Sequence, residues 1–200
     1  MRELARRIQK RLDSLYGLET PDVTSFLRPS AERREVLEVR QSRRGDVEIA
    51  LYLPEEADQG GRPPTLDVLC QVAEGVSHFV YLAERSRRRL PTTQLELELQ
   101  AEVDKFVVLA ASVEPSRPGA PLASHTTSAL RERLYGNVRF LHPEGTETGE
   151  RYRLANRLAA RFVRSFDGEL GKRAEERAKR RLIRFFDSGQ REKLEMVLAA

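Results

Sequence analysis

Two segments near the end of the sequence place arginines on one side of a helical wheel and apolar residues on the other. Successive residues of an α-helix are about 100° apart, so positions three and four apart share a face. The first basic face contains Arg153, Arg157, Arg161 and Arg164, opposite Leu154, Leu158, Phe162 and Phe166. The second contains Arg173, Arg177, Arg180, Arg181 and Arg184, opposite Ala174, Ala178, Leu182 and Phe185. Both segments are therefore predicted to be amphipathic helices that bury one side and expose a row of guanidinium groups.

The positive charge of the chain is local. Residues 151–200 hold fourteen lysines and arginines against seven acids, whereas residues 1–150 hold 21 against 24. Such an asymmetry indicates a surface for an anionic partner. An arginine-rich composition is the alternative explanation, because thirty of the 35 basic residues are arginines and these would occupy any solvated helix face. The sequence leaves both readings open.

The first half of the chain mixes helix and strand signals. Residues 2–16 carry one apolar stripe and predict an amphipathic helix that ends at Gly17. Residues 35–41 and 47–53 alternate and contain many β-branched side chains, with a glycine-containing turn between them. They predict a β-hairpin. The polar stretch 55–64, which contains glycines and prolines, is expected to be a surface loop.

Residues 65–89 and 94–112 each carry apolar residues at helical spacing and predict an antiparallel pair of helices. Thr93 and Glu96 have the spacing of a capping box at the start of the second helix. The three prolines and the glycine of residues 113–124 predict a linker. After it, the pattern indicates helices at about 125–135 and 189–199, on either side of the two arginine-striped helices.

These elements predict an α+β fold that is mostly helical. It consists of an N-terminal helix, a small antiparallel β-hairpin packed on a helical hairpin, and a C-terminal helical bundle. The expected regions are an α+β region at 1–112, a Pro-rich linker at 113–124 and a basic helical region at 125–200. The chain has no run of about 18 apolar residues, so no membrane span is expected and a soluble, cytoplasmic protein is predicted.

Four polar residues of the predicted helical pair are spaced as metal ligands can be. Glu74 and His78 are four residues apart on one helix, as are Glu98 and Glu102 on the other, and together they could hold a cation. The spacing differs from the Glu-x-x-His pattern of di-iron bundles. Glu74 and His78 fall on the polar arc of their helix, where a solvated or partner-facing role is expected. No metal site is therefore predicted, and one made by these four residues stays open as an alternative.

Glu102 falls inside the apolar stripe of its helix, between Leu95 and Phe106. A buried carboxylate needs a partner or a raised pKa. The expected partner is an arginine or a tyrosine brought in by tertiary packing, and the alternative is a general acid or base. No neighbouring nucleophile or set of oxyanion donors can be assigned around it.

The sequence contains no recognised motif for a cofactor, and none is expected. Its glycines lack the pattern of a phosphate-binding loop, and no zinc-finger, RRM or KH signature is present. The basic faces suit contacts to phosphate, but the aromatic residues beside them lie mostly on the apolar arcs, so no base-stacking platform is indicated.

The prediction is a non-enzymatic cytoplasmic interaction or adaptor protein that docks an acidic or polyanionic partner through its C-terminal arginine faces. The first alternative is a nucleic-acid-binding protein without sequence preference. The second is a metal-dependent enzyme that uses Glu74, His78, Glu98 and Glu102. The sequence also leaves a homo-oligomer open.

Overall fold

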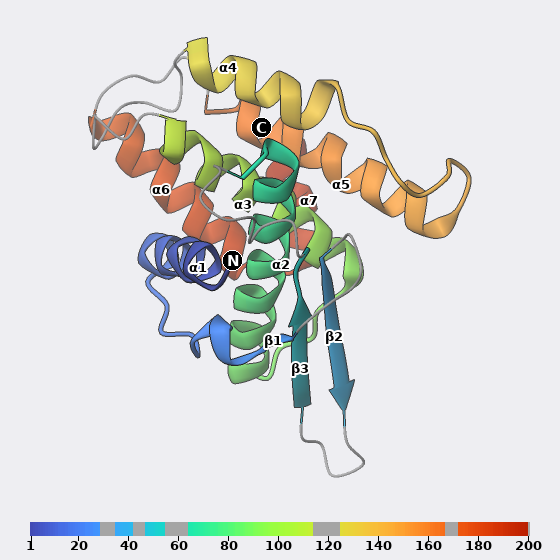
Figure 1. Ribbon diagram of the computed structural model, residues 1–200. Coiled ribbons are helices and arrows are strands. Elements are labelled where there is room, and N and C mark those ends of the chain that lie inside the picture. The colour runs from blue at the N-terminus through green and yellow to red at the C-terminus, as the bar shows by residue number, and fades with distance from the viewer. Residues whose placement is uncertain (29–34, 42–46, 55–63, 114–124, 167–171, 200) are drawn as a thin grey trace. The chain divides into compact units, whose positions relative to one another are not determined.

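The computed structural model describes residues 1–28, 35–41, 47–54, 64–113, 125–166 and 172–199 (Figure 1). The chain divides into two compact units, Met1–Leu90 and Pro91–Ala200. Helices predominate in both, and a small sheet belongs to the first. The predicted class, α+β and mostly helical, is confirmed.

The N-terminal unit begins with α1 (Arg2–Tyr16), whose apolar stripe is buried as predicted. Gly17 ends the helix with φ 68°, a left-handed conformation that glycine adopts without a steric penalty. Helix α1 packs against α2 (Leu66–Arg87), where the side chain of Thr65 caps the first turn by accepting a hydrogen bond from Val68 N at 3.3 Å. The two helices provide most of the core of this unit.

A three-stranded sheet completes the N-terminal unit. Strands β2 (Val36–Gln41) and β3 (Val47–Tyr52) pair antiparallel, which confirms the predicted hairpin. Strand β1 (Leu27–Arg28) pairs parallel with β3 and gives the order β1-β3-β2. Sequence analysis missed β1 because two residues carry no periodic signal.

Gly75 lets the sheet approach α2 closely. A Cβ atom at this position would lie 2.9 Å from Leu51 Cδ1 and 3.2 Å from Leu53 Cδ2. Both leucines are buried, so the sheet covers this side of the helix.

Helix α2 ends in a turn that places Arg89 in the left-handed region. Leu90 N donates to Arg85 O at 2.9 Å, and φ of Arg89 is 55°. This position of a helix end is usually glycine, because the left-handed conformation strains a residue that has a Cβ atom.

Replacing Arg89 with glycine should therefore stabilise the protein. Relief of the backbone strain outweighs the greater chain entropy of glycine in the unfolded state, for a net gain of about 0.5–1 kcal/mol. Chemical denaturation would measure the free energy of unfolding. The control is Arg7→Gly in the regular part of α1, which should lower that free energy by about 1 kcal/mol. An Arg89→Gly variant that is less stable than the unmodified protein would show that the side chain matters more than the backbone.

The C-terminal unit is built around α3 (Gln94–Val113), which is buried from Glu98 to Ala110. The predicted capping box is present, since Glu96 N donates to Thr93 Oγ1 at 3.1 Å and Thr93 N donates to Glu96 Oε2 at 2.9 Å. Helix α3 contacts three of the following helices, α4 (His125–Arg131), α5 (Glu147–Arg164) and α7 (Gln190–Leu198).

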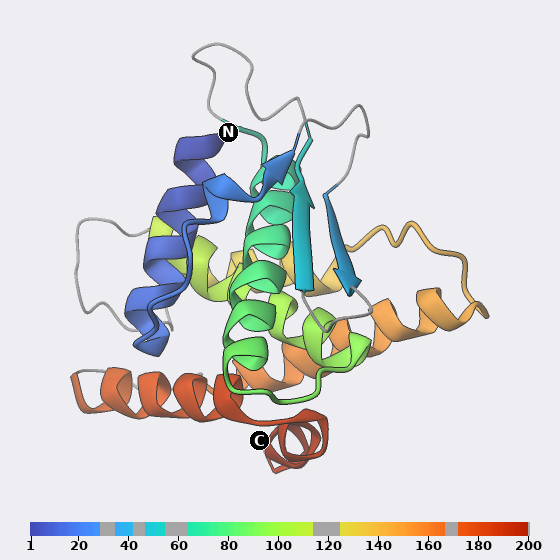
Figure 2. The same ribbon diagram turned by 90° about the horizontal axis from the view of Figure 1, so that it is seen from below.

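Helix α6 (Lys172–Asp187) joins α5 and α7, and α7 is seen end-on beside it in Figure 2. Helix α4 continues into a turn of π-helix at Glu132–Gly136. The two compact units divide at 90/91, and helix α3, which contacts α4 and α5, belongs to the C-terminal one. The predicted regions 1–112, 113–124 and 125–200 stay a prediction. Residues 114–124, to which the linker was assigned, lie outside the described residues.

A polar network lies inside this unit. Lys193 on α7 is fully buried, and its ammonium group donates to Gln100 Oε1 at 2.7 Å and to the carbonyl oxygen of Phe185. Gln100 Nε2 in turn donates to Asp104 Oδ1 at 2.9 Å, and both of these α3 residues are fully buried. The network connects α7 to α3 across 93 residues of sequence.

Among the residues that the structure describes, no helix combines the length and the apolarity needed to cross a membrane.

Candidate anion-binding faces of the C-terminal unit

Helix α5 begins at Thr146, whose side chain accepts a hydrogen bond from Gly149 N at 3.1 Å. Its buried residues are Gly149, Ala155, Asn156, Ala159, Phe162 and Val163. Phe162 is buried as predicted, but Leu154 is 36% exposed, so the expected apolar arc is wrong at this position. Helix α5 packs along α3, and its buried side includes the small residues Ala155 and Ala159 but not Leu154.

Six arginines of the two basic helices are exposed: Arg157, Arg161 and Arg164 on α5, and Arg177, Arg180 and Arg184 on α6. Within the described ranges, the side chains of four of them, Arg157, Arg164, Arg180 and Arg184, have no recorded hydrogen bond or ion pair. Arg157 and Arg164 lie on one side of α5, and Arg180 and Arg184 on one side of α6, because the members of each pair are seven or four residues apart. The structure thus presents these four guanidinium groups to solvent without a partner.

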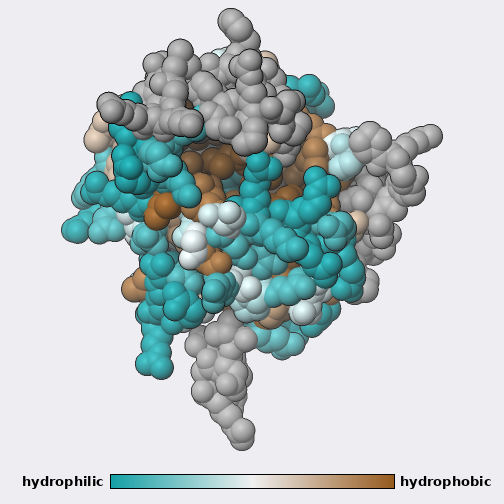
Figure 3. Space-filling model, turned by 90° about the vertical axis from the view of Figure 1, so that its left-hand side faces the viewer, coloured by the Kyte–Doolittle hydropathy of each residue, from teal (hydrophilic) through white to brown (hydrophobic). Residues whose placement is uncertain are grey.

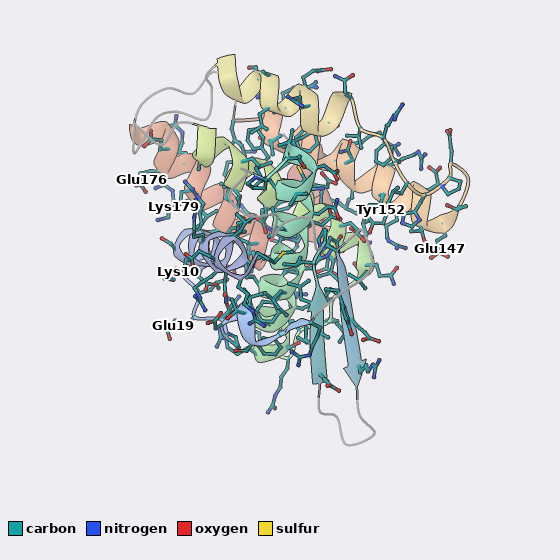
Figure 4. The ribbon with its side chains drawn as sticks, viewed as in Figure 1. Lys10, Glu19, Glu147, Tyr152, Glu176 and Lys179 are labelled. Atoms are coloured by element: carbon teal, nitrogen blue, oxygen red, sulfur yellow. The ribbon has the colours of Figure 1, made fainter. Side chains whose placement is uncertain are left out.

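Figure 3 views the molecule from the side on which α6 lies in Figure 1. Most of the coloured surface is hydrophilic, with apolar side chains visible between the polar ones. In Figure 4 the side chains of Glu176 and Lys179 project outward from α6. Lys179 is exposed and adds a cation that the arginine pattern did not include.

Two of the predicted arginines are engaged by backbone carbonyl groups of the same unit. Arg153 Nη1 donates to His142 O and to Gly149 O, each at 3.0 Å, and its guanidinium lies 4.8 Å from the centre of the Phe140 ring. Arg161 Nη2 donates to Leu198 O at 2.7 Å. These arginines hold the chain before α5 and the end of α7 against α5.

Arg181 joins the two basic helices. Its Nη2 atom donates to Ser165 Oγ at 2.8 Å, and its guanidinium lies 5.1 Å from the centre of the Phe166 ring. Phe162 of α5 also stacks on Phe185 of α6, with ring centres 4.2 Å apart. The end of α5 is therefore fixed to α6 by one arginine and a pair of aromatic rings.

The two remaining arginines of the predicted set lie on α6. Arg177 is exposed, and the side chain of Arg173 lies outside the described residues. The nine predicted arginines thus form three groups. Four are exposed without a recorded partner, and three (Arg153, Arg161 and Arg181) bond to other parts of the unit. The remaining two are Arg173 and Arg177. The helical wheel could not make this separation, because the partners of Arg161 and Arg181 lie 37 and 16 residues away in the sequence.

Glu102, the carboxylate predicted to need a partner, is buried and has one. Lys105 Nζ donates to Glu102 Oε1 at 2.8 Å, one turn further along α3. A tyrosine also approaches, since Tyr135 Oη donates to the carbonyl oxygen of Glu102 at 2.8 Å. The structure thus gives Glu102 a lysine of its own helix as ion-pair partner, a local pairing that the search for a tertiary partner overlooked.

The other candidate ligands are also withdrawn from solvent. Glu98 is 8% exposed, and Arg151 Nε lies 4.0 Å from its Oε1 atom. On α2, His78 is 7% exposed and Glu74 is half-buried, so the expectation of a solvated arc is wrong. Buried positions occur on every side of the middle of α2. The alternative of a metal site formed by Glu74, His78, Glu98 and Glu102 stays untested.

Comparison of the chain with protein-family models, curated proteins and solved structures finds no match, so the functional argument rests on the residues described above.

Proposed function

We propose that this protein is a non-enzymatic cytoplasmic adaptor that docks an acidic or polyanionic partner through Arg157, Arg164, Arg180 and Arg184. The observation that carries the proposal is that these four arginines are exposed and have no recorded acidic partner within the described residues. Like charges on neighbouring turns repel one another, and an anionic partner relieves that repulsion.

The chemistry of the four side chains suits this role. A guanidinium group is planar and donates two parallel hydrogen bonds to a carboxylate or a phosphate. The helices that carry the four groups are fixed by Arg153, Arg161 and Arg181. A partner would therefore meet donors on a rigid support, which lowers the entropy lost on binding.

An acidic protein is the favoured partner, and nucleic acid is the alternative. Phe162, Phe166, Phe185 and Phe186, the phenylalanines of α6 and of the end of α5, are all buried. They are not available to stack on unpaired bases, which is how proteins that bind single strands gain much of their affinity. Duplex binding through phosphate contacts alone needs no such rings.

Fluorescence anisotropy with a labelled polyglutamate peptide and a labelled DNA duplex would test the proposal. We expect the peptide to bind at about 50 mM salt and to be released as the salt rises toward about 300 mM, because the contacts are between exposed charges. Tighter binding of the duplex, with a salt slope of about 0.9 per phosphate contacted, would favour the nucleic-acid alternative. If neither probe binds at low salt, the arginine faces are only solvated surfaces.

A further inference from the structure

The N-terminal unit contains a pocket of about 370 Å³ beside the end of α2. Its floor is apolar and comes from three elements: Phe26 after η1 (Val23–Ser25), Ile49 on β3, and Phe79 and Ala83 on α2. Ser86 and Arg87 lie at the rim. The volume falls within the range of small-molecule sites, which is about 300–1,000 Å³, and the lining is mainly apolar, as it is in such sites.

Gln9, a buried residue of α1, holds the loop that contributes Thr20 and Pro21 to the pocket lining. Gln9 Nε2 donates to Thr20 Oγ1 at 2.7 Å and to Pro21 O at 2.6 Å. Its Oε1 atom accepts a hydrogen bond from Val23 N at 2.9 Å. This loop is therefore held in place without a ligand, and a preformed site loses less entropy on binding.

The end of α2 contributes Glu84, Ser86 and Arg87 to the lining of the pocket. Four of the last five residues before Leu90 are arginines, and Glu84 is the acid beside them. Glu84 accepts two hydrogen bonds from Arg87, Nε to Oε2 and Nη2 to Oε1, each at 2.7 Å. These bonds, together with a bond from Arg88, hold the pKa of the Glu84 carboxyl below its ordinary value, although burial opposes the shift.

The groups left for a ligand at this end are hydrogen-bond donors. Arg87 Nη1 has no recorded partner in the described part of the chain, and the side chain of Ser86 is exposed. The carboxylate of Glu84 is already shared by Arg87 and Arg88, so its negative charge is compensated. Glu19, on the other side of the pocket, projects outward from the loop after α1 (Figure 4).

From this arrangement we propose that the pocket binds a small amphiphilic anion, a monomeric carboxylic acid with an aliphatic or aromatic body. The apolar body lies against Phe26, Ile49 and Phe79, and the carboxylate accepts hydrogen bonds from Arg87 and Ser86. An amine of the same shape meets the Arg87 guanidinium and finds the Glu84 carboxylate already bonded by Arg87 and Arg88. This site is independent of the arginine faces on α5 and α6.

Isothermal titration calorimetry with octanoate, octanol and octylamine separates the contribution of the apolar chain to the affinity from that of the charged group. The three probes share one chain length and are used below the concentrations at which they aggregate. We expect octanoate to bind most tightly and octylamine least. Arg87→Gln should weaken octanoate by about three- to tenfold, the effect of losing one partly exposed charged hydrogen bond, and leave octanol unchanged. Arg7→Gln on α1 removes the same charge elsewhere in the unit and should change neither affinity.

Filling the pocket tests its location. Ala83→Leu places extra atoms in the floor and should abolish octanoate binding in a protein that retains its helical circular dichroism. Because a floor substitution can disturb packing, Ser86→Trp at the exposed rim provides a second block with little risk to folding. The proposal fails if octanoate does not bind, if octylamine binds as tightly as octanoate, or if the folded rim variant retains the unmodified affinity.

Discussion

Replacing Lys193 with methionine should lower the free energy of unfolding by about 3–5 kcal/mol, the range found when one partner of a buried charged network is removed. The ammonium group of Lys193 satisfies Gln100 Oε1 and the carbonyl oxygen of Phe185 inside the protein. It also lies 4.2 Å from the centre of the Phe185 ring. Methionine nearly preserves the length of the side chain, so the loss measures the missing donor and charge rather than a cavity.

Two variants make this measurement specific. Lys179→Met removes an exposed lysine of α6 and should change the free energy of unfolding by no more than about 0.5 kcal/mol. Asp104→Leu combined with Gln100→Leu and Lys193→Met replaces these three side chains with apolar ones and should recover part of the loss, because Gln100 Oε1 and Asp104 Oδ1 are then not left buried without a donor. A loss below about 1 kcal/mol for Lys193→Met alone would mean that water replaces the ammonium group in the variant.

The helices could be predicted from the sequence because each carries an apolar stripe long enough to show its period. Helix α1 and its end at Gly17 follow from such a stripe and from one conformational preference. Strand β1 could not be predicted, since its two residues become a strand only by pairing with β3. Local patterns thus predict elements that are stable through their own periodicity, and they miss those that depend on a distant neighbour.

The same distinction applies to the polar residues. Lys193 is one helical turn from Val197, which is fully buried, so the wheel already places this lysine toward the core. Its partner Gln100 is 93 residues away, and no local pattern indicates which amide or carbonyl oxygen accepts hydrogen bonds from the Lys193 ammonium group. For the arginine faces, the sequence identifies the basic side of each helix. Only tertiary packing shows that Arg181 is held by Ser165 while Arg180 and Arg184 remain at the surface.

Reversing the charge of Arg180 and Arg184 together should weaken binding of the polyglutamate peptide by about a hundredfold at low salt. Two attractive contacts become repulsive, and like charges placed against each other across an interface oppose binding by several kcal/mol. The Arg157→Glu, Arg164→Glu pair on α5 should have a similar effect if the partner spans both helices. If the partner covers α6 alone, the substitutions on α5 should weaken binding only slightly. All four side chains are exposed, so we expect the melting temperature to remain close to that of the unmodified protein.

The matched control for this experiment is Arg133→Glu with Arg139→Glu. Both residues are exposed in the same unit, and the double substitution changes the net charge by the same amount. It therefore reproduces any general loss of attraction for an anion without touching the two basic helices. We expect this control to weaken binding of the peptide only a few-fold, since it leaves the exposed arginines of α5 and α6 in place and salt screens the remaining exposed charges. Equal weakening by the control and by the α6 pair would show that the partner senses only the total charge of the unit, and that α5 and α6 present no docking face of their own.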